Sequence, residues 1–313
     1  MPWRHLQPNV LIGLCSVLGV LISASVLVRL LQVLRPQKDF SEVRLRVRTW
    51  WVMAGLFVAA LVLSNDFALS FFGFVSFLAL KEYLSLTATR RADRRVLFWA
   101  YLAIPLQYYW ISLGWYGMFI VFIPVIMFLC LPMRMVLIGE TSGYLHAIGT
   151  LHWGLMVTVF CLSHVAYLLV LPEKGNPVGG GAGLVLFLVA LTQLNDVAQF
   201  CWGKPFGRHK VLPTVSPNKS YEGLFGGLAT TIALAVLLAP YLTPLNLRES
   251  LTAGLLIGMG GFMGDVMIAA LKRDLGIKDS GNILPGHGGI LDRVNSLTCT
   301  GPLFFHFIYH LHY

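Results

Sequence analysis

Long apolar segments, separated by short polar ones, run through almost the whole chain. Ten of them approach the about 20 mostly apolar residues that a membrane-spanning helix needs. We expect these helices over residues 10–34, 49–64, 66–80, 96–113, 114–133, 147–172, 179–200, 223–243, 250–271 and 297–312. The second, third and last segments are short or interrupted, so nine spans are an alternative. The pattern predicts an all-α, polytopic transmembrane helix bundle of about 9–10 spans.

Composition leads to the same class of protein. Hydrophobic residues make up 57% of the 313 residues, and charged residues only 12%. A soluble domain carries about 25% charged residues. A soluble fold with this composition would expose large apolar patches, so the lipid bilayer is its natural solvent.

The formal net charge of +9 explains membrane topology better than it explains nucleic-acid binding. If the N-terminus faces outside and the chain alternates sides, 19 of the 23 Lys and Arg residues lie on the inner side. This is the positive-inside pattern, and it adds attraction to anionic lipids. We therefore expect membrane lipids as partners and no nucleic acid. From the compact length and the absence of soluble extensions, we expect a multi-pass protein of the bacterial inner membrane.

Four polar segments separate the spans on the predicted cytoplasmic side. Segments 35–48 and 81–95 are basic and simple, and we expect them to be plain connections. Segments 201–222 and 272–296 are rich in Gly, Pro, Lys and Ser, and the two helices between them return both segments to the same face. We divide the chain into N-terminal transmembrane helices, 1–145, and a C-terminal catalytic region, 146–313, that holds both cytoplasmic active-site loops.

Four carboxylates are candidates for chemistry. Asp196 and Asp265 fall at or inside apolar spans, where an ionisable group is costly and usually faces a polar cavity. Asp279 and Asp292 lie in the final loop. Carboxylates that converge can hold a hard cation such as Mg²⁺.

Basic residues and glycines accompany these carboxylates in the final loop. Lys272, Arg273, Lys278 and Arg293 can bind phosphate oxygens, and the glycines of Pro285–Gly289 allow close approach of the backbone to phosphate. His287 lies among these glycines. Loop 201–222 contributes Ser216, Asn218 and Lys219. Each residue alone has an ordinary explanation, such as an ion pair, an anchor or a turn, but together they match a metal–nucleotide site. The chain has no GxxxxGK[ST] sequence.

Residues 264–297, GDVMIAALKRDLGIKDSGNILPGHGGILDRVNSL, resemble the C-terminal signature of the CDP-diacylglycerol synthase (phosphatidate cytidylyltransferase) family. The resemblance lies in Lys272-Arg273, Lys278-Asp279, Gly286–Gly289 and Asp292-Arg293, at the expected spacing. Residues 195–227 are similar to the other cytoplasmic loop of that family. The chain departs from the pattern in three places. Ala269 replaces a serine, and Asn295 replaces the last aspartate of D-R-x-D. After Asp196, Val197–Phe200 stands where the family has a small, hydroxyl-rich run that ends in an aromatic residue.

The resemblance implies that CTP and phosphatidate react to CDP-diacylglycerol and pyrophosphate with the help of Mg²⁺. It implies Asp265 and Asp292 as metal ligands, and it groups Asp265, Asp292, Lys272, Arg273, Lys278 and Asp279 as catalytic. The expected substrate-binding residues are Ser216, Asn218, Lys219, His287, Arg293 and Asp196. A second cation and a homodimer are left open.

Three alternatives remain at this point. The departures at Ala269 and Asn295 would suit a weakened relative that serves as a partner, or an enzyme acting on another lipid phosphate. A lipid transporter would share the spans and intramembrane charges. It would usually place its site at the midplane between repeated halves, whereas the polar clusters here lie on one face.

Overall fold

The computed structural model describes residues 6–35, 37, 39–87, 94–281, 283–286 and 288–313. Its α-helices are α1 (Pro8–Leu34), α2 (Ser41–Leu63), α3 (Asn65–Leu86), α4 (Arg94–Ser112), α5 (Tyr116–Val121), α6 (Phe128–Val136), α7 (Tyr144–Leu155), α8 (Cys161–Tyr167), α9 (Gly180–Phe206), α10 (Tyr221–Leu242), α11 (Leu247–Asp274), α12 (Leu291–Val294) and α13 (Leu297–His312). Single π-helical turns join α5 to α6 (Phe122–Met127) and α7 to α8 (Met156–Phe160). Short 3₁₀ turns cover Leu168–Val170 and Glu173–Gly175.

Each of the ten predicted spans is helical in the structure. Within the described residues, eight helical segments are long and apolar enough to cross a membrane: α1, α2, α3, α5–α6, α7–α8, α9, α10 and α11. The other two predicted spans correspond to α4, with 19 residues, and α13, with 16 residues. The protein is therefore an all-α, multi-pass membrane protein, as predicted.

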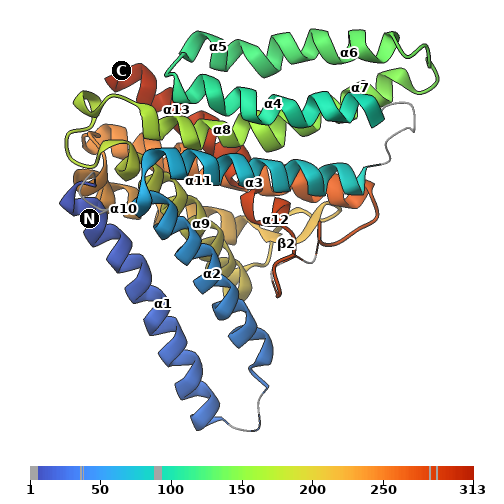
Figure 1. The fold of residues 1–313 in the computed structure, drawn as a ribbon. Helices are drawn as coiled ribbons and strands as arrows, with labels where there is room; N and C mark the ends of the chain where they lie inside the picture. Colours follow the sequence, from blue (N-terminus) through green and yellow to red (C-terminus); the bar gives the residue numbers. More distant parts are fainter. Residues whose placement is uncertain (1–5, 36, 38, 88–93, 282, 287) are drawn as a thin grey trace.

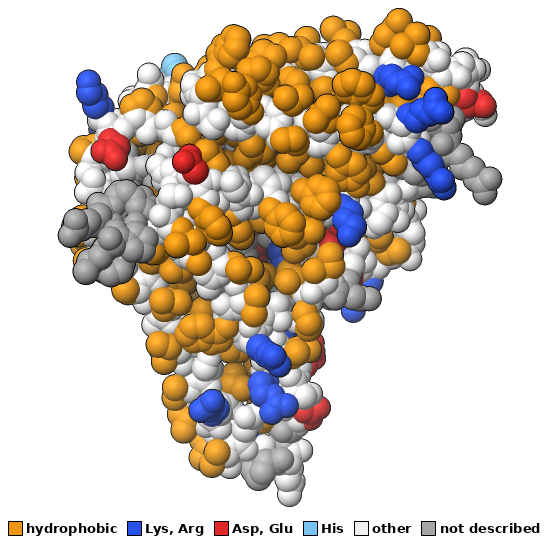
Figure 2. Space-filling model, viewed as in Figure 1, with side chains coloured by type: hydrophobic (Ala, Val, Ile, Leu, Met, Phe, Trp, Pro, Cys, Tyr) orange, Lys and Arg blue, Asp and Glu red, His pale blue; other side chains and the backbone are white. Residues whose placement is uncertain are grey.

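The helices form a bundle with one pair at its edge (Figure 1). Helices α3 and α4 and the α5–α6 and α7–α8 segments run side by side, while α9, α10, α11 and α13 pack on one another. The α1–α2 hairpin projects from this body, and only 11% and 17% of its two apolar windows are buried, against 56% for α9. Figure 2 shows hydrophobic side chains over much of the visible face, with Lys and Arg gathered mostly toward one end of the bundle and the tip of the hairpin.

Capping residues in the sequence determine where α10 and α11 begin. Ser220 precedes α10, and its Oγ accepts a hydrogen bond from the N–H of Gly223 at 3.2 Å. Asn246 and Glu249 form a reciprocal capping box at the start of α11. Such caps satisfy N–H groups that have no partner inside the helix.

The polar segments are shorter and more ordered than we predicted. Helix α3 continues through Leu86, α9 through Phe206 and α11 through Asp274. Between α9 and α10 the chain forms an antiparallel hairpin of β1 (Lys210–Leu212) and β2 (Ser216–Ser220). The sequence interpretation had treated 201–222 as a cytoplasmic loop and had predicted no strands in it. A long apolar segment identifies the part of a helix that lies in the membrane. It does not show how far the helix continues into polar sequence, nor does it predict strands in the polar segments.

Candidate active site

The first of two lysine–aspartate pairs joins the β-hairpin to α11. Lys219 Nζ, from β2, lies 2.7 Å from Oδ2 of Asp265. The Asn295 side chain donates to Oδ1 of Asp265 at 2.6 Å, and Lys219 also donates to Oε1 of Gln199 at 2.9 Å. The two charged side chains remain 20% and 27% exposed. This open pair can therefore be reached by a ligand from solvent.

The second pair joins α11 to α12 and is closed. Lys272 Nζ lies 2.7 Å from Oδ1 of Asp292, whose side chain is only 4% exposed. Oδ2 of Asp292 accepts from the N–H groups of Ser280, at 2.8 Å, and Gly289, at 3.1 Å, and the Ser280 hydroxyl lies 2.9 Å away. Burial raises the pKa of Asp292, but the hydrogen bonds and the Lys272 charge outweigh it and hold the pKa below its usual range. The buried carboxylate is thus ionised.

Two adjacent residues connect the aspartates of α9 and α11. Asn295 contacts Asp265, and the hydroxyl of Ser296 lies 2.9 Å and 3.1 Å from the carboxylate oxygens of Asp196. Gly264 permits this contact, because a Cβ there would collide with the carbonyl oxygen of Asn295. The segment between α12 and α13 therefore lies directly against α11.

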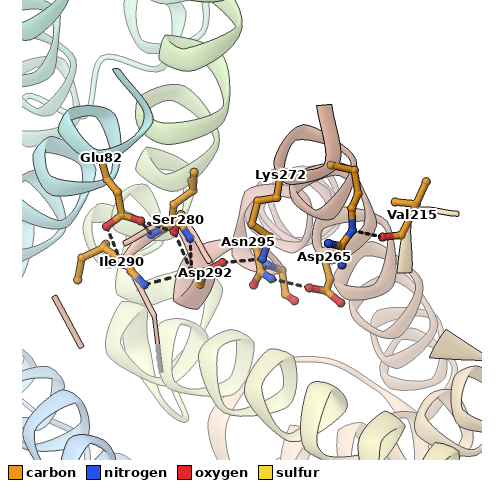
Figure 3. A network of polar contacts seen from close by, with 12 residues as sticks. Glu82, Val215, Asp265, Lys272, Ser280, Ile290, Asp292 and Asn295 are labelled. Carbon is orange, nitrogen blue, oxygen red and sulfur yellow. Dashed lines mark hydrogen bonds and ion pairs between the residues drawn. The ribbon is translucent and has the colours of Figure 1, made fainter. Parts of the chain in front are cut away.

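A further carboxylate, from the N-terminal helices, enters this network (Figure 3). Glu82 of α3 is 5% exposed and accepts hydrogen bonds from the N–H groups of Ile290, at 2.8 Å, and Leu291, at 3.1 Å. Its carboxylate also accepts from the hydroxyl of Ser280. The sequence interpretation missed Glu82, because it placed the end of this span at residue 80. Only the structure shows that Glu82 is buried on the same face of α3 as Ser76 and Ala79.

A family comparison bears on this arrangement. The model of the cytidylyltransferase family matches residues 44–311, which include all four members of the two lysine–aspartate pairs. This chain belongs to the cytidylyltransferase family. The match covers most of the chain, and family membership makes the protein a nucleotidyltransferase.

Individual relatives of this cytidylyltransferase-family protein fall in two groups. A protein of Escherichia coli (strain K12) is 47% identical over 296 residues, which is 95% of this chain and 97% of the relative, and its name, Uncharacterized protein YnbB, states no activity. Phosphatidate cytidylyltransferases of Staphylococcus epidermidis and Staphylococcus aureus (strain COL) are each 36% identical, over 47% of this chain and 58% of their own length. The chain thus matches little more than half of each staphylococcal enzyme.

Within this member of the family, the other predicted site residues have varied surroundings. Arg273 donates through Nε to the carbonyl oxygen of Val215, at 3.1 Å, and so links α11 to the β-hairpin. Arg293 is half-buried, and among the described residues its Nε has no hydrogen-bond partner. The remaining residues are Lys278, Asp279 and Asn218, which are exposed, Ser216, which is half-buried, and His287, which lies outside the described residues.

The glycines of the final loop adopt the conformations that we expected of them. Gly286 has φ of +76° and Gly288 has φ of +81°, a region that side-chain-bearing residues rarely occupy. An isolated β-bridge pairs Leu284 with Gly288. At Gly289, a Cβ would collide with the carboxylate of Glu82. The loop is therefore folded tightly against α3.

The donor set fits a hard cation that takes part of its coordination from substrate. Among the described residues, no three His, Cys, Asp or Glu side chains are grouped closely enough to hold a metal. Mg²⁺ commonly uses one or two protein carboxylates and completes its shell with phosphates and water. Asp265 and Asp292 supply two carboxylates of the kind that Mg²⁺ uses, and a bound cation would take the place of the ammonium group that now lies 2.7 Å from each. The predicted metal pair, Asp265 and Asp292, stays a prediction.

Proposed function

We propose that this protein is a phosphatidate cytidylyltransferase, which converts CTP and phosphatidate to CDP-diacylglycerol and pyrophosphate. The observation that carries the proposal is the convergence of Lys219, Asp265, Lys272 and Asp292 from β2, α11 and α12 within a cytidylyltransferase-family chain. Lys272 lies near the C-terminal end of α11, and Lys219 lies just before the start of α10, where a soluble nucleotide and a membrane lipid can meet.

The chemistry needs charge neutralisation more than it needs a base. An oxygen of the lipid phosphate attacks the α-phosphorus of CTP; a new P–O bond forms as the bond to pyrophosphate breaks, and the electron pair leaves with pyrophosphate. The attacking phosphate is already ionised at neutral pH. The main obstacle is bringing two polyanions together, so positioning and positive charge supply most of the rate enhancement.

The basic residues and carboxylates divide these tasks. Lys219, in the open pair, would receive a substrate phosphate, and Lys272 would bind a second one beside Asp292. Asp265 and Asp292 would hold Mg²⁺, which supplies charge neutralisation on the phosphates when bound. The other proposed phosphate and nucleotide contacts are Arg273, Lys278, Arg293, Ser216, Asn218, Asp279, Asp196 and His287.

The location of the site follows from the same reasoning. With the basic loops on the inner side of a bacterial inner membrane, CTP would arrive from the cytoplasm and phosphatidate would enter sideways between helices. A homodimer and a second cation remain compatible with this proposal.

A second candidate is a relative that uses another lipid phosphate or has weakened catalysis. The observation that favours it is the amide of Asn295, which donates to Asp265 at the position where the family pattern has a carboxylate. One negative charge is thereby removed from the carboxylate cluster. Ala269 removes a hydroxyl from the same helix as Asp265.

Transfer of labelled phosphate would decide between these candidates. Purified protein in detergent is incubated with Mg²⁺, phosphatidate and CTP labelled in its α-phosphate, and we expect label in the lipid fraction. Diacylglycerol in place of phosphatidate should give none, and Asp265→Asn should lose at least about 1,000-fold in rate, as expected when a group that organises the transition state is removed. Label only with a different lipid phosphate would favour altered specificity. No label with any lipid phosphate, from folded protein, would contradict catalysis.

A further inference from the structure

Glu82 stands outside the residues that the mechanism uses, yet it contacts the segment that carries Asp292. It lies near the C-terminal end of α3, 198 to 209 positions before its partners in the chain, and is 5% exposed. A buried carboxylate is costly unless hydrogen bonds compensate it. Among the described residues, the compensation comes from the loop around Asp292: two backbone N–H groups and one hydroxyl.

Ser280 connects Glu82 to the closed lysine–aspartate pair. Its hydroxyl lies within hydrogen-bond distance of Glu82 and, at 2.9 Å, of Asp292, while its N–H donates to Asp292 at 2.8 Å. A serine hydroxyl has one hydrogen and can donate to only one carboxylate at a time. Whichever carboxylate the hydroxyl donates to, the N–H groups of Ile290 and Leu291 still bind Glu82, and the N–H of Ser280 still binds Asp292.

The backbone of the loop has the shape that this contact requires. Gly289 donates its N–H to Asp292 at 3.1 Å, and its Cα lies so close to Glu82 that a side chain would collide with the carboxylate. A second contact from the N-terminal helices lies nearby, since Thr49 of α2 donates to the carbonyl oxygen of Pro285 at 2.7 Å. Helices α2 and α3 thus hold the loop from the side opposite α11.

We propose that Glu82 is a positioning residue of the active site: by holding segment 288–292 against α3, it fixes where Asp292, and through it Lys272, meets the nucleotide. The part of this inference that concerns the nucleotide rests on the proposed function. The part that concerns the loop rests on the hydrogen bonds alone. The N-terminal helices then contribute to the site that we had assigned to residues 146–313.

The first measurement is kinetic, on Glu82→Gln, which preserves size and removes the negative charge. In either orientation of the glutamine amide, its NH2 group would face the N–H of Ile290 or of Leu291, and one of these two hydrogen bonds would be lost. Segment 288–292 should therefore shift. We expect KM for CTP to rise about tenfold while KM for phosphatidate stays within about twofold, because only the nucleotide contacts are displaced. A variant that merely contained less folded protein would have a lower kcat and unchanged KM values. The matched control is Glu42→Gln, an exposed glutamate of α2 paired with Arg46, which should behave as wild type.

The second measurement is hydrogen exchange, which needs no activity. In Glu82→Gln, amides of segment 288–292 should exchange at least about tenfold faster, since the partners of two N–H groups are altered, and Glu42→Gln should leave them unchanged. Gly289→Ala is the alternative variant if Glu82→Gln does not fold, because it displaces the same contact without altering charge.

Unchanged exchange together with unchanged KM for CTP in Glu82→Gln would overturn the inference. If the wild type transfers no cytidylyl group, the proposed function fails, while the exchange rates still decide whether Glu82 holds the loop.

Discussion

The two lysine–aspartate pairs of the site have the same chemistry and almost the same geometry, but they differ in their surroundings. Both place Nζ 2.7 Å from a carboxylate oxygen. In the open pair, Asp265 is 27% exposed and has an amide and an ammonium group as partners. In the closed pair, Asp292 is 4% exposed and holds loop backbone as well as Lys272.

The difference suggests a division of labour. An exposed ion pair contributes little to stability, so the open pair is free to exchange its partners for a ligand. A buried pair cannot lose one member without leaving an uncompensated charge. The closed pair therefore has a structural task in addition to any catalytic one, and the two aspartates should respond differently to the same substitution.

The largest expected difference is in stability. Asp292→Asn should lower the free energy of unfolding by about 3 kcal/mol, because it leaves Lys272 without its buried partner. Asp265→Asn should change it by less than about 1 kcal/mol, because that pair is partly exposed. Thermal unfolding in detergent, followed by tryptophan fluorescence, measures both. Equal destabilisation by the two substitutions would refute the proposed division.

A smaller effect, on the Mg²⁺ requirement, should appear when the aspartate of the family pattern is restored at position 295, beside the open pair. Asn295→Asp replaces the amide that donates to Asp265 with a second acid, and two neighbouring carboxylates bind a divalent cation more tightly than one. We expect the Mg²⁺ concentration for half-maximal transfer to fall about threefold to tenfold. The control is Asn65→Asp, an exposed position at the start of α3, outside the proposed site. An increase in the required Mg²⁺ would indicate that the Asn295 hydrogen bond is the more important feature.

The smallest expected effect is the pH dependence of the stability that the closed pair contributes. The pKa of Asp292 is lower in the folded protein than in the unfolded chain, so its contribution to stability is complete above the unfolded value and is lost as pH falls through the folded one. The difference in unfolding temperature between wild type and Asp292→Asn should be constant from about pH 5 to 8 and should shrink below about pH 4. A difference that instead grew as pH fell from about 6 to 4 would mean that folding raises the pKa of Asp292.

Much of this protein could be predicted from its sequence. The apolar segments are helices in the structure, because a membrane span must satisfy its backbone hydrogen bonds within one continuous segment. Gly286 and Gly288 of the final loop adopt positive φ angles, which other residues resist, because that freedom is a local property of glycine. The cytidylyltransferase family was identified from two short polar segments, and the family match confirms it.

What only the tertiary structure decided is how these segments meet. No local pattern relates Glu82 to Ile290, or Arg273 to Val215, since each contact joins side chains and backbone from different parts of the chain. The β-hairpin before α10 was also missed, because its strands have only three and five residues and lie outside the long apolar segments. The sequence by itself determined the helices, the membrane and the chemical inventory, which depend on residues close together in the chain. The contrast between an open and a closed pair depends on burial, and burial exists only once distant segments have packed together.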